Sequence, residues 1–436
     1  MRLSTLFTMM TALTAFQGTA QATDIEFWYG NTGSGEAAIQ AACKGFNESQ
    51  TKDHITCTGQ GSYEAGMQKA IAAYRSKNHP VLIQFFDAGT LDLMLSGAVI
   101  PVSEAMPDVK WDEYIAGARA YYETAEGKLY SQPYNSSTLL FYTNRTMLEK
   151  AGVTKTPETW EEVIEAARKL KAAGAACPFT TDVNPWRQLE QFAARHGVPI
   201  ASKHNGYDGL DAEYVFNQGI IKQHLNNLKN WRDEGLVRLN ADTKAGDYTA
   251  AFNAGECAMM EGSSGSYATS LKAFGDKYQI TVSMAPMYAG HERHNTLVGG
   301  ASLWLMKGHS EAEVAAAQAF LDYLRMPEQQ IAFTEMTGYL PVTQAAIDKL
   351  EKDGLADNPK FGTARIGMQS LSMPATPDTR GVRLGFYVQF REIFNEETQK
   401  AYAGEISMDA ALDNAKRRGD ELLSRFKATY ASAAAN

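Results

Sequence analysis

The chain has 436 residues, of which 44% are hydrophobic and 21% charged, and its formal net charge is −9. The composition is that of an ordinary globular protein, and the length is too great for one hydrophobic core, so two domains are expected. An acidic chain repels nucleic acid and anionic lipid at long range, so any anionic ligand must be held by a local cationic site.

Residues 1–22 have the pattern of a secretory signal peptide. Arg2 gives a positive start, residues 3–16 are mildly apolar, and Ala20-Gln21-Ala22 fits a cleavage site between small residues. No cysteine follows the expected cut, and no later run approaches the ~20 apolar residues of a membrane helix. We therefore expect a soluble periplasmic protein without a lipid anchor.

Short strands alternate with amphipathic helices along the mature chain. A strand at 24–29 precedes the glycine-rich turn 30–35 and a helix, and a strand at 54–58 precedes a second helix. The run 81–86 has the character of a buried strand. This alternation predicts a mostly parallel sheet covered by helices on both faces.

The same alternation returns later in the chain, with clear helix boundaries. Capping boxes occur at Thr159–Glu162 and Ser310–Glu313, and Asn184 followed by Pro185 is typical of a helix start. No repeat, low-complexity tract or long linker separates the two regions. We therefore expect two α/β lobes between which the chain crosses more than once.

Four cysteines in an oxidising compartment suggest disulfides, with three possible full pairings. Cys43, on a predicted helix, could pair with Cys57 on the next strand. Cys177 and Cys257, both at or near predicted strands, could form the other bridge. Four buried thiols are the alternative.

The chain shows no recognisable catalytic, metal or cofactor motif. The eight histidines form no H-E-x-x-H pattern, and the turn 30–35 lacks both the Lys-Ser/Thr of a P-loop and G-x-G-x-x-G spacing. The segment 262–265 is not a G-x-S-x-G nucleophile elbow. We therefore expect a protein that is not an enzyme and that needs no metal or cofactor.

Several segments occur in an order that is specific to one family. They are Gly61–Glu64, Ser131–Thr138, Cys257–Met259, Gly299–Trp304, Thr337–Pro341 and Arg383–Gly385. Together they resemble the glycerol-3-phosphate-binding proteins of periplasmic ABC uptake systems, from about residue 24 to about residue 425. Single pieces such as T-G-Y-L-P are shared more widely among sugar-binding relatives, but the ordered set is more specific.

The resemblance implies two α/β lobes joined by hinge segments, with the ligand in the cleft between them. Lobe one would comprise 23–134 and 296–345, and lobe two 135–295 and 346–436. Pro133 and the pair Gly299-Gly300 fall near the expected crossings. The expected partners are a small organic phosphate and the membrane subunits of an ABC transporter, with no nucleic acid, and the expected state is a monomer.

The family's binding pocket carries over to six positions: Tyr63, Ser137, Ser263, Gly300, Tyr339 and Arg391. A guanidinium can donate two parallel hydrogen bonds to phosphate, so Arg391 is the predicted main anchor, a lone guanidinium ringed by uncharged donors. The alternatives are a surface ion pair of Arg391 with a neighbouring glutamate, core packing for the tyrosines, and a one-position error at the serines.

Two positions depart from the family pattern. Asp87 stands where relatives have a glutamate, and Val183 where they have a tryptophan, while Trp186 matches a separate family tryptophan. The loss of an indole widens the pocket, and a diester carries less charge than a monoester. We therefore predict glycerophosphocholine as a better fit than glycerol-3-phosphate, with Asp87 and the neighbouring aromatic residues Phe85 and Phe86 favouring its quaternary ammonium group. The alternative is that local loop shifts refill the space and glycerol-3-phosphate remains the ligand.

Three other functions remain open at this stage. A neutral oligosaccharide-binding protein of the same fold would not depend on Arg391. A periplasmic phosphodiesterase would need clustered metal ligands, which the sequence does not offer. A ligand sensor that docks on a chemoreceptor cannot be separated from a transport protein by sequence.

Overall fold

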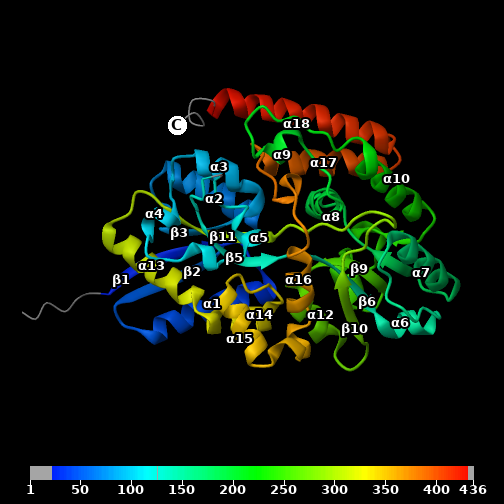
Figure 1. The fold of residues 1–436 in the computed structure, drawn as a ribbon, viewed down its shortest axis with the longest axis horizontal. Coiled ribbons are helices and arrows are strands. Elements are labelled where there is room, and N and C mark those ends of the chain that lie inside the picture. Colours follow the sequence, from blue (N-terminus) through cyan, green and yellow to red (C-terminus); the bar gives the residue numbers. More distant parts are fainter. Residues whose placement is uncertain (1–21, 125, 431–436) are drawn as a thin grey trace, which may run out of the picture.

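The computed structural model describes residues 22–124 and 126–430, so nearly all of the predicted signal peptide lies outside the described residues. Two β-sheets lie side by side, each with helices packed around it, in an elongated molecule (Figure 1). The two-sheet α/β architecture expected from the sequence is confirmed.

The first sheet has the order β2-β1-β3-β11-β4, with β5 also paired to β11. β1 runs parallel to β2 and β3, whereas β11 is antiparallel to β3, β4 and β5. The strands are β1 (Thr23–Tyr29), β2 (Asp53–Gly59), β3 (Leu82–Phe86), β4 (Val99–Ile100), β5 (Gln132–Ser137) and β11 (Gly299–Met306).

The second sheet has the order β10-β6-β9-β7-β8, in which β7 is parallel to β8 and β9 and the other pairs are antiparallel. Its strands are β6 (Leu139–Asn144), β7 (Cys177–Thr180), β8 (Val237–Arg238), β9 (Cys257–Ser263) and β10 (Ile280–Met284). Both sheets are therefore mixed rather than mostly parallel. β6 and β11 each enter their sheet from the other one, without the crossover helix that makes neighbouring strands parallel.

The chain passes from the first sheet to the second at Thr138, between β5 and β6, and returns before β11. Two residues of the predicted pocket lie beside these passages: Ser137 directly before the first, and Gly300 directly after the second. The limits of the two lobes stay a prediction.

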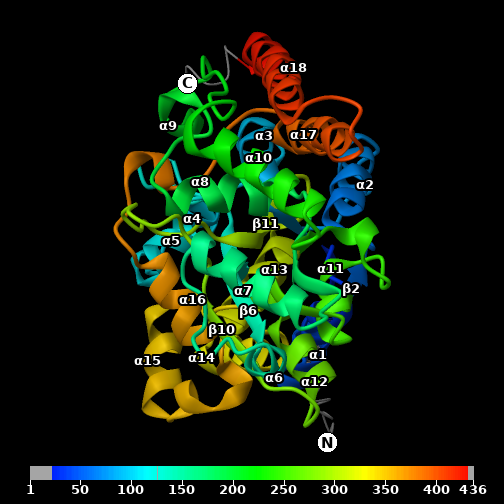
Figure 2. The ribbon, with the colours of Figure 1, turned by 90° about the vertical axis from the view of Figure 1, so that its right-hand side faces the viewer.

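Helices α1 (Gly33–Ser49), α2 (Tyr63–Arg75) and α13 (Glu311–Arg325) pack on the first sheet, and α7 (Trp160–Ala172) and α11 (Tyr248–Asn253) on the second. α17 (Tyr387–Tyr402) and α18 (Met408–Tyr430) pack on each other along the upper edge of the molecule (Figures 1 and 2). The remaining helices are α3 (Thr90–Leu95), α4 (Val102–Ala105), α5 (Ala116–Arg119), α6 (Arg145–Lys150), α8 (Phe192–Arg195), α9 (Ser202–Gly206), α10 (Gly219–Asp233), α12 (Tyr267–Phe274), α14 (Pro327–Thr337), α15 (Gln344–Lys352) and α16 (Ala364–Leu371).

The predicted helix starts are confirmed, with one change of helix type. Capping boxes form at Thr159, before α7, and at Ser310, before α13. Asn184 caps its helix by accepting a hydrogen bond from the Trp186 amide at 2.9 Å. The segment that follows, Trp186–Gln191, is a π-helix, and α8 continues it.

Both disulfides form in one of the possible pairings. Cys43–Cys57 ties α1 to β2, and Cys177–Cys257 joins two residues that face each other across β7 and β9. The alternative of four buried thiols is wrong. Each bridge therefore reinforces one sheet rather than linking the two.

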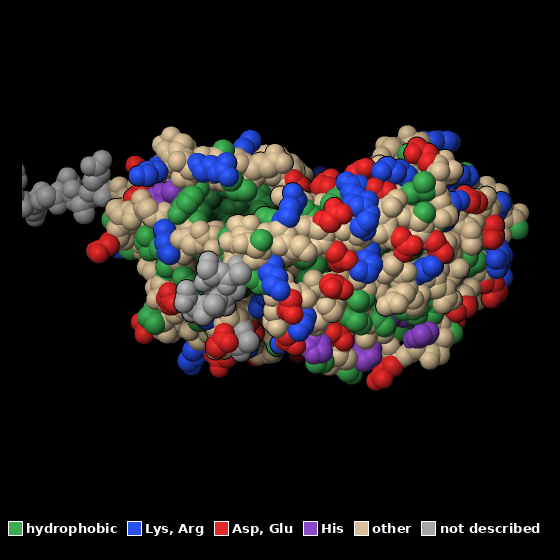
Figure 3. Space-filling model, turned by 90° about the horizontal axis from the view of Figure 1, so that it is seen from above, with side chains coloured by type: hydrophobic (Ala, Val, Ile, Leu, Met, Phe, Trp, Pro, Cys, Tyr) green, Lys and Arg blue, Asp and Glu red, His purple; other side chains and the backbone are tan. Residues whose placement is uncertain are grey.

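Within residues 22–124 and 126–430, no helix is long and apolar enough to cross a membrane. Figure 3 shows basic and acidic side chains interspersed over the face seen from above, with a hollow lined by hydrophobic side chains in its left half. The negative net charge is therefore not gathered into one acidic patch on this face.

Candidate functional site

A network of neutral side chains lies where the two sheets meet. The Gln84 amide, at the centre of β3, donates to Asn31 Oδ1 at 2.6 Å and to Asn135 Oδ1 at 2.7 Å. Asn135 in turn donates to the hydroxyl of Tyr63 at 2.7 Å, and Asn31 donates to the hydroxyl of Tyr339 at 3.2 Å. Two of the predicted pocket residues, Tyr63 and Tyr339, are thereby held in one network.

The chain positions these two tyrosines at the ends of helices. Tyr63 is the first residue of α2, directly after the N-cap Ser62, and Tyr339 follows the left-handed Gly338 that ends α14. Burial raises the pKa of the Tyr63 phenol well above its ordinary value, and the neighbouring Tyr339 adds to this. Tyr63 therefore keeps its proton at neutral pH and remains a hydrogen-bond donor.

Ser137 and Gly300 lie on paired strands beside this network. In the β5–β11 pair, Ser137 faces Gly299 and Ser136 faces Gly300. Gly300 has a φ of +105°, and a Cβ at this position would lie 2.0 Å from the carbonyl oxygen of Asn135. Only glycine fits there, because any side chain would force β5 and β11 apart.

Ser263 comes from the other sheet, at the end of β9. Its hydroxyl accepts a hydrogen bond from the Gly265 amide at 3.2 Å, which forms a tight turn. A Cβ at Gly265 would lie 2.9 Å from the ring of Tyr339, so this turn packs directly on that tyrosine. The structure thus brings five of the predicted residues, Tyr63, Ser137, Ser263, Gly300 and Tyr339, to the junction of the two sheets.

Arg391 lies in a second cluster, on α17, and it is buried rather than solvated, with 12% of its side chain exposed. Its Nε and Nη2 donate to the two carboxylate oxygens of Glu190, each at 2.8 Å. Nη2 also donates to Asp87 Oδ1 at 3.0 Å. The expectation of a lone guanidinium is therefore wrong, because two buried carboxylates pair with it. The surface ion pair is also wrong for Arg391, since Glu396 and Glu397 pair with Lys400 and Arg418.

Burial and the neighbouring charges shift the pKa values of Asp87 and Arg391. Burial raises the pKa of Asp87 to about 6, Arg391 opposes this shift, and the negative charge of Glu190 adds to it. Burial disfavours the charged guanidinium, but Glu190 and Asp87 outweigh this effect and hold the pKa of Arg391 well above its usual value. Arg391 is therefore always charged, while Asp87 changes its charge near pH 6.

Phe86 joins the two clusters into one site. Its ring stacks on the ring of Tyr63 with centroids 5.6 Å apart, and the Arg391 guanidinium lies 5.8 Å from its centroid on a cation–π contact. The ring of Tyr387 lies 5.4 Å from the same guanidinium. Phe85, the preceding residue, points to the opposite face of β3 and packs against Trp304. Of the two phenylalanines, only Phe86 borders this site.

Val183 and Trp186, the two residues predicted to form a wall of the pocket, occupy different places. Val183 is half-buried and lines a groove of about 670 Å³ that lies past the ends of β7 and β8, against the later turns of α17. Trp186 is buried in a small cluster with Leu139 and Ala285, and a Cβ at Gly299 would lie 2.5 Å from its ring. Trp186 thus packs on the strand that carries Gly300, and Val183 borders open space.

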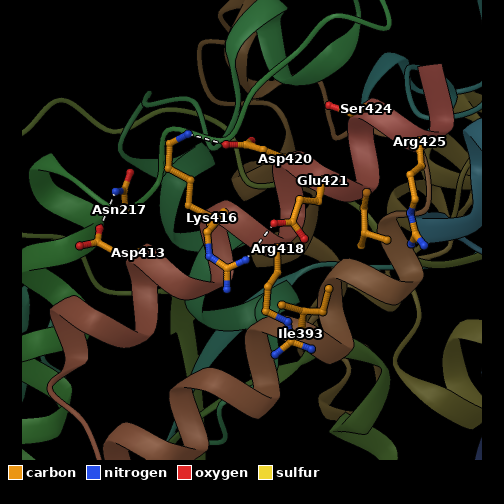
Figure 4. Close-up of a pocket in the computed structure, with 11 residues that line it drawn as sticks. Asn217, Ile393, Asp413, Lys416, Arg418, Asp420, Glu421, Ser424 and Arg425 are labelled. Atoms are coloured by element: carbon orange, nitrogen blue, oxygen red, sulfur yellow. Dashed lines mark hydrogen bonds and ion pairs between the residues drawn. The ribbon is translucent and has the colours of Figure 1, made fainter. Parts of the chain in front are cut away.

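A larger groove of about 920 Å³ runs along the outer side of α17 and α18 (Figure 4), but it contains none of the predicted residues. Four of its charged side chains form ion pairs within the groove: Lys416 pairs with Asp420 at 2.6 Å and Arg417 with Glu421 at 2.8 Å. The junction of the sheets, where buried charges, aromatic rings and donors converge, is the better candidate.

No group of three or more potential metal ligands occurs among residues 22–124 and 126–430. Sequence reasoning missed Glu190 together with the amide side chains of Asn31, Gln84 and Asn135. The cap at Asn184 predicts a helix that includes position 190. A π-helix has more residues per turn than an α-helix, so a 3.6-residue pattern misplaces the side chains that follow the cap. Gln84 lies in the predicted strand 81–86, and Asn135 lies in the family segment Ser131–Thr138.

Comparisons with known proteins identify the family of the chain. Residues 41–363 match the family described as bacterial extracellular solute-binding protein. The sn-glycerol-3-phosphate-binding periplasmic protein UgpB of Agrobacterium fabrum is 37% identical over 92% of this chain and 92% of that protein. UgpB of Escherichia coli K12 is 36% identical over 95% of each chain.

Two solved structures have the same fold. UgpB from Mycobacterium tuberculosis in complex with glycerophosphocholine superposes with a TM-score of 0.76 and 22% identity, covering 93% of this chain and 99% of that one. The GacH receptor of Streptomyces glaucescens, solved unliganded and with acarbose, gives a TM-score of 0.78 and 20% identity over 93% of this chain and 100% of that one. At these identities the likeness establishes the two-lobed fold and no more.

Proposed function

The chain belongs to the bacterial extracellular solute-binding proteins, and from this premise we propose that it captures a glycerophosphodiester such as glycerophosphocholine, or sn-glycerol-3-phosphate, for an ABC importer. It would act as a monomer in the periplasm, reached through a cleaved signal peptide, and pass its ligand unaltered to the membrane subunits of the transporter. Curated relatives that share more than a third of their residues with this chain are named as binding proteins, which supports binding rather than catalysis.

One observation carries the proposal: a network of neutral donors on the first sheet and the guanidinium of Arg391 on α17 meet at Phe86. In the described residues, Arg391 Nη1 takes part in none of the three hydrogen bonds that hold the guanidinium. We assign this nitrogen to a phosphate oxygen of the ligand. Tyr339, Ser263 and the Gly300 amide would add uncharged donors to the phosphate.

Tyr63 and Ser137 would hold the glycerol part, with Asp87 as an acceptor for its hydroxyls. Asp87 is 2% exposed and keeps a second carboxylate oxygen besides the one bound to Arg391. The groove that Val183 lines includes none of the other predicted site residues, so we assign Val183 no contact with the ligand. Trp186 would act as a rigid wall behind Gly299 rather than as a direct ligand contact.

Calorimetric titration of the full chain with glycerophosphocholine, sn-glycerol-3-phosphate and a maltooligosaccharide tests the proposal. We expect binding of one or both phosphate compounds and none of the sugar. Arg391→Lys keeps a positive charge for the two carboxylates but removes Nη1, so it should weaken phosphate-ester binding by about tenfold or more. Arg417→Lys, in the exposed groove of Figure 4, is the matched control and should bind as the wild type does.

Binding of the sugar with no response to either phosphate compound would overturn the proposal in favour of an oligosaccharide-binding protein. Incubation with glycerophosphocholine followed by an assay for free choline tests the remaining alternative. Enzyme-dependent choline release would identify a phosphodiesterase.

A further inference from the structure

Glu190 is completely buried, with 0% of its side chain exposed, yet it lies in a site that must admit a polar ligand. It projects from the π-helical segment Trp186–Gln191 and accepts two parallel hydrogen bonds from Arg391. π-Helical turns are rare and occur frequently at functional sites. A buried carboxylate in such a turn needs an explanation beyond packing, because burying its charge is unfavourable.

The carboxylates outnumber the guanidinium at this point. Asp87 comes from the end of β3 in the first sheet, Glu190 from the second lobe, and Arg391 from α17. Among the described residues, Asp87 and Glu190 form no ion pair other than the one with Arg391. At neutral pH the cluster therefore carries one net negative charge in a region shielded from solvent.

This charge balance acts differently on the two candidate ligands. A phosphate monoester carries between one and two negative charges at neutral pH, so it meets net repulsion. A diester of an amino alcohol carries one negative and one positive charge, so its anionic group can reach Arg391 Nη1 while its cationic group is attracted by the excess carboxylate. The rings of Phe86 and Tyr387 lie 5.8 and 5.4 Å from the guanidinium and help to hold it beside the two carboxylates.

We propose that Glu190, together with Asp87, determines the charge preference of the site, so that it selects solutes in which a phosphate is balanced by a cationic group and disfavours phosphate monoesters. The inference rests on the proposed function. Glu190 acts through Arg391 and is a positioning residue: it orients the guanidinium and cancels most of its charge.

The decisive variant is Glu190→Gln, which keeps the size of the side chain and one oxygen for Arg391 but removes the negative charge. Dissociation constants for glycerophosphocholine and sn-glycerol-3-phosphate are measured by calorimetry at pH 7.5 on wild type and variant. We expect the preference for the choline diester, expressed as the ratio of the two constants, to fall by about tenfold or more in the variant. The equivalent change at Glu397 of α17, which is buried but pairs with Lys400 and Arg418, should leave the ratio unchanged.

Two further variants keep the test decisive if Glu190→Gln does not fold. Asp87→Asn removes the other negative charge and should shift the ratio in the same direction. Glu190→Asp keeps the charge and should preserve the ratio even if both affinities decrease. In the charge-removing variants Glu190→Gln and Asp87→Asn, by contrast, a ratio that stays constant while both ligands bind more weakly would overturn the inference and leave Glu190 a structural residue. Failure of the wild type to bind either compound would instead overturn the proposed function, and the inference with it.

Discussion

Replacing Arg391 with alanine should destabilise the protein as well as abolish ligand binding. The change removes three hydrogen bonds, two of 2.8 Å to Glu190 and one of 3.0 Å to Asp87. It leaves two carboxylates, 0% and 2% exposed, with no counter-charge. A buried charge without a partner is far more unfavourable than a lost surface pair.

Removing one partner of a buried ion pair reduces stability by about 3–5 kcal/mol. At an unfolding entropy of about 2.1 cal/mol/K per residue over roughly 400 residues, this corresponds to a fall in Tm of about 4–6 °C. Adding Glu190→Gln to Arg391→Ala should recover part of the loss, because it removes one of the stranded charges.

Urea and thermal unfolding of the four proteins (wild type, Arg391→Ala, Glu190→Gln and the double variant) measure the coupling directly. Arg417→Ala is the control, since its ion pair with Glu421 joins side chains that are 63% and 65% exposed and should contribute less than about 1 kcal/mol. If Arg391→Ala were as mild as this control, the reasoning about a buried charge cluster would be refuted.

Three further outcomes are expected. Gly300→Ala should reduce the free energy of unfolding in urea by at least about 2 kcal/mol, because the new Cβ would lie 2.0 Å from the Asn135 oxygen at a positive φ. An unchanged urea midpoint would contradict the close approach of β5 and β11. Replacing both Cys177 and Cys257 with alanine removes a bridge that closes a separation of 80 residues. Loss of this chain constraint should reduce stability by about 4.5 kcal/mol, and a double variant as stable as wild type would contradict this expectation. The raised pKa of Asp87, about 6, means that the native state binds this proton more tightly than the unfolded chain does. Wild type should therefore lose about 2 kcal/mol of stability relative to Asp87→Asn as the pH rises from about 4 to 6. Parallel stability curves for the two proteins over that range would show that the carboxyl is not perturbed.

Local features of the chain were readable from the sequence. The capping boxes at Thr159 and Ser310 satisfy backbone amides within three residues of each other, so spacing alone identifies them. The bridge between Cys43 and Cys57 joins a helix to the strand that follows it, which is also a short-range relation. The directions of the strands were not readable, because they depend on which sheet the chain enters at Thr138 and again before β11.

Part of the candidate site followed from resemblance, and part did not follow from the sequence at all. The tyrosines at 63 and 339 were matched to family positions, and the fold places both in one hydrogen-bonded network with Asn31. The sequence did not indicate that Glu190 belongs to the site. A glutamate in an amphipathic helix is usually exposed to solvent, and the π-helical turn changes the face of the helix on which Glu190 lies. Its partner Arg391 lies 201 residues away along the chain.

The sequence by itself determined the alternation of strands and helices, the helix starts, and the chemical types available for binding a phosphate ester, because these depend on neighbours within one or two turns of the chain. Tertiary structure alone decided the charge of the site. Electrostatic energy depends on distance and on exclusion of water, and only the folded chain brings both Asp87 and Glu190 within 3.0 Å of Arg391 in a buried place. Arg391, which the sequence predicts to be an unpaired phosphate anchor, therefore belongs to a cluster with one excess negative charge.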